Sequence, residues 1–82
     1  MVSDLDRCLA ERLDHARLML ISMGDDLARS EAVIAEHGVA IQAVDIVGQM
    51  LAHIANVIRA EDRRLAIDRI GMCELKAVLA AA

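Results

Sequence analysis

Phe, Tyr, Trp and Pro are all absent from this chain of 82 residues, and Gly occurs only four times. Aromatic side chains normally supply much of the area buried in a core, so packing here must rely on aliphatic residues, Met, Ala and Cys. Such chains pack helices ridge into groove, or they enlarge a thin core by oligomerising. The scarcity of Pro and Gly, which disfavour helix interiors most strongly, also favours an all-α fold.

Motifs for catalysis and cofactor binding are lacking as well. The chain offers no nucleophile with a base and an orienting group, no Gly-rich phosphate loop and no paired catalytic carboxylates. Cys8 and Cys73 are far apart in the sequence and fit neither a metal knuckle nor a redox pair. We therefore expect no enzymatic activity, no cofactor and no metal. Reduced cysteines and the absence of a signal-peptide pattern in MVSDLDRC predict a cytoplasmic location.

A net basic charge is also missing. The chain has 13 acidic and 9 basic residues, a formal charge of −4, which repels a phosphate backbone. The one concentration of basic residues has acidic residues at 61, 62 and 68 interleaved with it, and it comprises Arg59, Arg63, Arg64 and Arg69. Mixed-sign runs on helices are usually solvated faces. We expect no nucleic-acid partner.

Apolar residues in the first part of the chain repeat with helical spacing. At 100° per residue they project within about 80° of arc and form one apolar stripe. Its members are Leu5, Leu9, Leu13, Ala16, Leu20, Met23, Leu27 and Ile34. The stripe keeps its phase across Gly24, which predicts one helix over about 4–36 that faces its neighbour with this stripe. Gly38 is the expected terminator, because Gly tolerates the left-handed conformation that closes helices.

A second helix is predicted over about 39–60, with an extension to about 70 left open. Between 37 and 58 the only charged residue is Asp45. The polar side chains project within about 80° of arc and define the polar seam, which comprises Gln42, Asp45, Gln49, His53 and Asn56. The rest of the circumference is apolar. A run of this length could cross a bilayer, but these polar groups are expensive in hydrocarbon, so we expect a buried soluble helix and no membrane span.

The complete prediction is one helical domain over 1–82. It is a long antiparallel helical hairpin followed by a short helix over about 72–80, which carries Met72, Leu75, Val78 and Leu79. One neighbouring helix covers only part of the apolar arc of the second helix, so dimerisation into a four-helix bundle is expected. The predicted interface residues are Val47, Met50, Leu51, Ile54, Val57 and Ile58.

This architecture predicts a non-enzymatic protein–protein interaction module, namely a small helical adaptor, a chaperone-like protein or a regulatory protein. Its partner would be a second copy or a helical segment of another protein. The size, acidity and hairpin are similar to those of small secretion chaperones and adaptors, a likeness of architecture without a shared motif.

Alternative roles remain open for several polar residues. Cys8, Glu11 and His15 lie on successive helical turns and could supply metal ligands. His15 or His53 could accept a phosphoryl group, as in histidine phosphotransfer domains. The spacing of Asp45, Gln49 and His53 fits either a buried ladder that fixes dimer register or a solvent-exposed edge.

Overall fold

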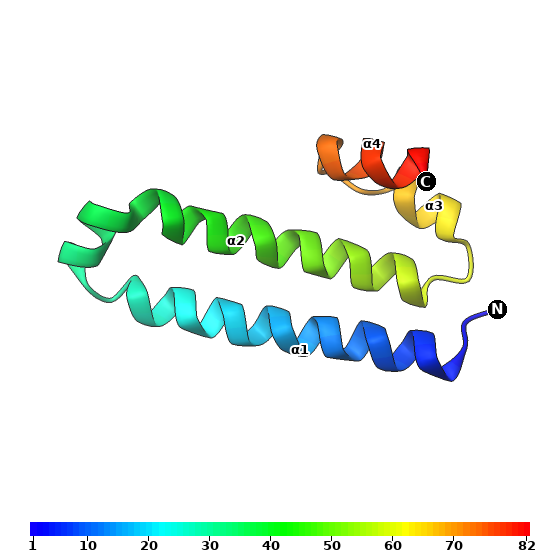
Figure 1. Ribbon diagram of the computed structural model, residues 1–82, viewed down its shortest axis with the longest axis horizontal. Helices are drawn as coiled ribbons and strands as arrows, with labels where there is room; N and C mark the ends of the chain where they lie inside the picture. Colours follow the sequence, from blue (N-terminus) through cyan, green and yellow to red (C-terminus); the bar gives the residue numbers. More distant parts are fainter.

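The structure, a computed structural model, describes residues 1–82 and contains only helices and short connecting segments (Figure 1). The elements are α1 (Asp4–Leu27), α2 (Glu31–Arg59), α3 (Arg63–Asp68) and α4 (Cys73–Ala81). The two long helices pack antiparallel, while α3 and α4 lie beside the C-terminal half of α2, on the side away from α1 (Figure 1). The predicted all-α class and antiparallel hairpin are confirmed.

The first helix begins at a complete capping box. Ser3 Oγ accepts a hydrogen bond from the backbone N–H of Asp6 at 3.0 Å, and Asp6 Oδ2 accepts one from the N–H of Ser3 at 3.3 Å. These bonds satisfy N–H groups that have no partner inside the helix. The helix then continues through Gly24 without a break, as predicted.

The turn of the hairpin lies at residues 28–30, and the prediction that placed it at 36–38 was wrong. Ser30 caps α2 by accepting a hydrogen bond from the N–H of Val33 at 3.3 Å. At His37 the backbone leaves the helical region, with φ −128° and ψ 25°, so α2 is kinked there and then resumes. Gly38 does not have the positive φ that closes a helix, and the Ser30 hydroxyl provides the better start signal.

Later boundaries also differ in detail from the predicted ones. The second helix ends at Arg59 and does not extend continuously to 70. Asp62 caps the separate helix α3 by accepting a hydrogen bond from the N–H of Leu65 at 3.0 Å. The short helix predicted over 72–80 corresponds to α4.

Small residues bring α1 and α2 close together. Ala10 and Ala55 are 1% and 0% exposed. A Cβ added at Gly24 would lie 3.0 Å from Val44 Cγ1, and one added at Gly48 would meet the side chains of Arg17 and Ile21 at 3.8 Å. The separation of two packed helices depends on the side chains at their contact, and these side chains are minimal.

The apolar stripe of α1 does not face α2, contrary to the prediction. Ala10 and Gly24 point about 90° away from the middle of the stripe at 100° per residue. Leu5 and Met23 are consequently 66% and 59% exposed. Bulky Leu and Met side chains would hold the helices apart, whereas the small residues beside them permit close packing. Ile34, the last predicted member of the stripe, belongs to α2.

The molecule is a single layer of helices. Its principal extents are 48 × 26 × 15 Å, and the smallest is not far above the diameter of one helix with its side chains, about 10–12 Å. Only five residues are buried, namely Val2, Ala10, Gly48, Ala55 and Ile70. Domains normally enclose a core between at least two layers, so this layer leaves apolar surface uncovered.

Candidate interaction surface

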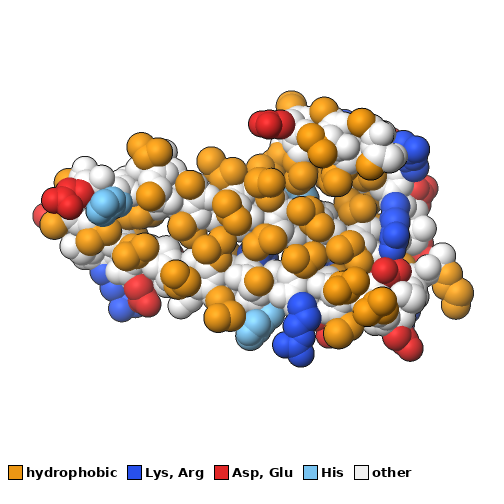
Figure 2. Space-filling view, viewed as in Figure 1, with side chains coloured by type: hydrophobic (Ala, Val, Ile, Leu, Met, Phe, Trp, Pro, Cys, Tyr) orange, Lys and Arg blue, Asp and Glu red, His pale blue; other side chains and the backbone are white.

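Hydrophobic side chains gather on one broad face of the layer, across α1, α2 and α4 (Figure 2). On both long helices the apolar residues lie about 90° from the direction of the α1–α2 contact. Antiparallel helices turn in opposite senses when seen from one end, so both sets fall on the same side of the hairpin. We call this surface the open face, and it comprises Leu5, Leu9, Met23 and Leu27 of α1 with Val47 and Ile54 of α2.

The predicted interface residues of α2 divide between three directions. Val47 is 44% exposed and Ile54 is half-buried, and both belong to the open face. Leu51 and Ile58 are half-buried and lie about 60° from Gly48 and Ala55, so they turn toward α1.

Met50 and Val57, also half-buried, point about 20° apart and lie toward α4 and α3. Coverage of any of these six residues by a second chain stays a prediction. The α1 residues of the open face were missed, because the sequence alone assigned them to the contact with α2.

The polar seam of α2 points away from the open face. Gln42, Asp45, Gln49 and Asn56 are exposed, and His53 is half-buried. No hydrogen bond joins the side chains of Asp45, Gln49 and His53, so the ladder considered above does not form within one chain. His53 and Asn56 instead line a cavity of 300 Å³ beside α3, together with Ala66, Arg69 and Ile70.

A hollow that we call the α2–α4 groove adjoins the open face. It has a volume of 320 Å³, and five of its six lining residues are hydrophobic. The lining residues are Ile46, Met50, Met72, Glu74, Leu75 and Val78. Methionine side chains adapt to irregular shapes, which suits such a groove to contact with another helix.

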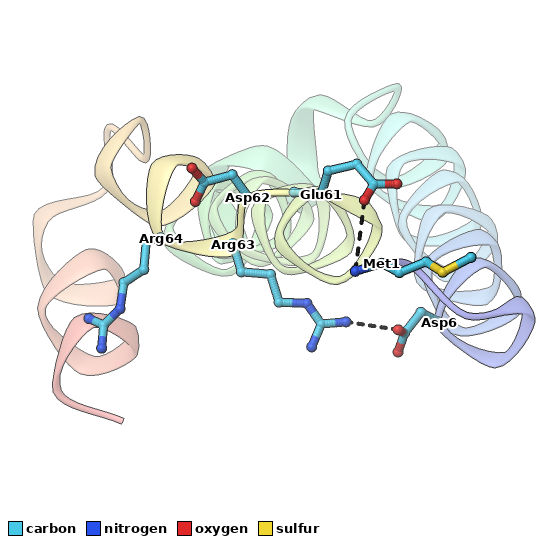
Figure 3. Close-up of a pocket in the computed structure, with 7 residues that line it drawn as sticks. Met1, Asp6, Glu61, Asp62, Arg63 and Arg64 are labelled. Carbon is cyan, nitrogen blue, oxygen red and sulfur yellow. Dashed lines mark hydrogen bonds and ion pairs between the residues drawn. The ribbon is translucent and has the colours of Figure 1, made fainter.

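Charged side chains tie the open end of the hairpin together (Figure 3). Arg63 Nη2 donates to Asp6 Oδ2 at 2.9 Å and to the carbonyl oxygen of Ile58 at 3.1 Å. The Met1 ammonium lies 3.9 Å from Glu61 Oε2, and the cavity between these groups has a volume of 590 Å³. These contacts fasten the start of α1 to the segment after α2.

Two of the four arginines in the basic cluster are engaged in this way. Arg59 Nη2 donates to Asp14 Oδ2 at 2.6 Å, and Arg63 pairs with Asp6. The backbone N–H of Ser3 lowers the pKa of the Asp6 carboxyl, and the hydroxyl of Ser3 and the Arg63 guanidinium lower it further, against a smaller opposing effect of desolvation. Both ion pairs cross the hairpin and therefore have a structural role.

The candidate metal ligands do not form a site in this structure. Cys8, Glu11 and His15 are exposed along α1, and no group of three His, Cys, Asp or Glu side chains is placed to hold a metal ion. His15 lies beside Leu18, Met19, Ser22 and Met23 in a shallow depression. No observation here favours a metal site or phosphotransfer over the interaction surface.

By length and composition alone, α2 could cross a membrane, with a mean hydropathy of 1.4 over its most apolar window, of which 11% is buried. Core helices of soluble proteins can be equally long and equally apolar.

The chain matches no protein-family model, and comparisons with curated proteins and with solved structures find no match. The functional proposal therefore depends on the surface itself.

Proposed function

We propose that this chain is a non-enzymatic protein–protein interaction module of the cytoplasm, a small helical adaptor, chaperone-like protein or regulatory protein. It acts as a homodimer in which two open faces pack together into a four-helix bundle. The observation that supports this proposal is the set of exposed apolar side chains that both long helices of the single layer present on the open face. A four-helix bundle is the common way in which helical hairpins enclose such a surface.

The accessible area of the chain supports a dimer-sized contact. The surface is 5993 Å², whereas a compact protein of 8.9 kDa exposes about 4,800 Å². The excess of about 1,200 Å² exceeds the area of about 800 Å² that each partner buries in a typical stable interface. A second copy of the chain would therefore cover the surplus.

Charge argues against a lipid or nucleic-acid surface as the occupant. The net charge of −4 opposes association with anionic lipid headgroups and phosphate backbones. Insertion of α2 into a bilayer would also expose Asp45 and the rest of the polar seam to hydrocarbon and would separate Arg59 from Asp14. A protein surface with matching apolar side chains carries neither cost.

The proposal is tested by light scattering coupled to size exclusion on the full chain. The wild type should elute with the mass of two chains at micromolar concentration. Val47→Asp places a carboxylate on the open face and should give a helical monomer, because Val47 is 44% exposed within its own chain. Gln49→Asp adds the same charge to the exposed polar seam and should remain dimeric. A monomeric wild type, or a dimeric Val47→Asp variant, would exclude this interface.

A further inference from the structure

The α2–α4 groove is not covered by any element of its own chain. α1 lies on the opposite side of α2, as the view along the hairpin shows (Figure 3), and α3 leads directly into α4. Ile46 and Val78, which line the groove, are 52% and 63% exposed. Met50, which lines the groove, projects about 50° from Val47 and Ile54 of the open face, so the groove lies beside the open face on the α4 side of α2.

We propose that the α2–α4 groove holds α1 of the second copy, with the two-fold axis of the dimer parallel to the hairpin. This inference rests on the homodimer proposed above and specifies its geometry. α1 and α4 occupy opposite edges of the layer, with α2 between them (Figure 3). A rotation of 180° about an axis parallel to the hairpin therefore brings α1 of each copy onto the α4 edge of the other. An axis across the hairpin would instead place α1 on α1 and leave both grooves empty.

The positions of α1 and α4 along the length of the hairpin agree with this axis. The N-terminal end of α4 lies level with the middle of α1 (Figure 1). Rotation about a parallel axis does not change these levels, so the middle of α1 in the second copy meets the start of α4. Ala16 and Leu20, two members of the apolar stripe, lie in that part of α1 and would enter the groove.

Charge complementarity supports the same arrangement. Glu74 is the only charged residue that lines the groove, and it forms no ion pair in its own chain. Arg12 lies one turn before Ala16, is exposed, and also forms no ion pair. It projects from the edge of the stripe that turns away from α2. After the rotation, this edge faces α4, so each dimer would contain two Arg12–Glu74 pairs.

A charge-reversal experiment tests the pairing. Arg12→Glu and Glu74→Arg should each weaken the dimer by about tenfold at low salt, because each creates two like-charge contacts. The double variant should return the dissociation constant, measured by sedimentation equilibrium, to near the wild-type value. The matched control combines Arg12→Glu with Glu36→Arg, which has the same net charge but places the arginine at the far end of the hairpin and should not restore affinity.

A cross-linking experiment tests the proximity directly. In a Cys8→Ser background, Ala16→Cys should form an intermolecular disulfide with Cys73 under mild oxidation, giving a covalent dimer on a non-reducing gel. Glu11→Cys, on the polar side of α1, is the control and should not cross-link to Cys73. A dimer that shows neither charge rescue nor the Ala16→Cys cross-link would overturn the axis and leave the homodimer standing. A monomeric wild type would overturn both proposals.

Discussion

Two glycines in the contact between α1 and α2 differ in the space around them. A Cβ at Gly48 would meet Arg17 and Ile21 at an ordinary van der Waals distance of 3.8 Å, whereas a Cβ at Gly24 would lie only 3.0 Å from Val44 Cγ1. Both glycines are inside helices, where Ala is favoured over Gly by about 1 kcal/mol. The packing around each position therefore decides how much of this gain is retained.

We expect Gly48→Ala to raise the thermal midpoint and Gly24→Ala to raise it less or to lower it. The helix propensity gained at Gly48, up to about 1 kcal/mol, is not offset by a steric conflict, while at Gly24 the side chain of Val44 must move. Calorimetry of the two variants at equal protein concentration measures the difference. Equal stabilisation by both substitutions would show that the helices are not packed as closely as described.

The Asp6 carboxylate makes stability depend on pH in a defined direction. Its pKa is lowered from the ordinary value of 3.8 by the hydrogen bond from the Ser3 N–H and by Arg63. A lowered folded pKa means that the carboxylate stabilises the fold above the ordinary value, and that this contribution is lost as the pH falls through the folded value.

Asp6→Asn should therefore reduce the difference in stability between pH 7 and pH values below about 4. Urea unfolding of the variant and the wild type at both pH values measures this difference. Asp25, which makes no ion pair or side-chain hydrogen bond, provides the control, and Asp25→Asn should retain the wild-type pH dependence. An unchanged pH dependence in Asp6→Asn would contradict the assignment.

At the scale of the elements, the boundary between the two long helices is set by the Ser30 cap and not by Gly38. Ser30 caps α2 through its hydroxyl, whereas Gly38 follows the kink at His37 with an ordinary negative φ. The helix continues beyond the kink because nothing closes it there. The kink therefore changes the direction of α2 without ending it.

Ser30→Ala should destabilise the chain by about 1 kcal/mol, since one N–H at the start of α2 loses its partner. Gly38→Ala should be neutral or stabilising, because no atom lies within 4 Å of the added Cβ. Chemical denaturation of both variants compares the two positions. Strong destabilisation by Gly38→Ala, with little effect of Ser30→Ala, would move the helix boundary back to Gly38.

At the scale of the whole molecule, the proposed dimer would couple the stability of the single layer to association. Five buried residues form a small core, and the open face contributes only when a second layer covers it. A folded state that exists as a dimer is stabilised by mass action, so its stability increases with protein concentration.

The thermal midpoint of the wild type should therefore rise by several degrees when the concentration is raised about a hundredfold. Circular dichroism in cells of different path length measures this shift. The Val47→Asp variant should show a lower midpoint that does not change with concentration. A midpoint of the wild type that is independent of concentration would indicate that the single layer is stable alone.

The sequence by itself determined the helical class, the antiparallel hairpin and the excess of apolar surface on α2. These properties depend on composition and on the 3.6-residue repeat of apolar side chains. Both can be read from a short stretch of sequence without knowledge of its neighbours in space. The continuity of α1 through Gly24 followed from the same local phase. The turn was misplaced because a serine cap and a glycine terminator compete, and local preference does not rank them reliably.

Only the tertiary structure decided which side of α1 packs on α2. The periodicity of the apolar residues alone predicts that the Leu stripe of α1 contacts α2. The two helices approach more closely through the small residues Ala10, Gly24 and Gly48, and this contact turns the stripe outward onto the open face. The cross-hairpin pairs of Asp6 with Arg63 and Asp14 with Arg59 were likewise decided in three dimensions, because their partners are far apart in the sequence. Helix packing depends on how well two helix surfaces fit each other. The sequence of each segment describes only its own surface, so it does not show which two surfaces will meet.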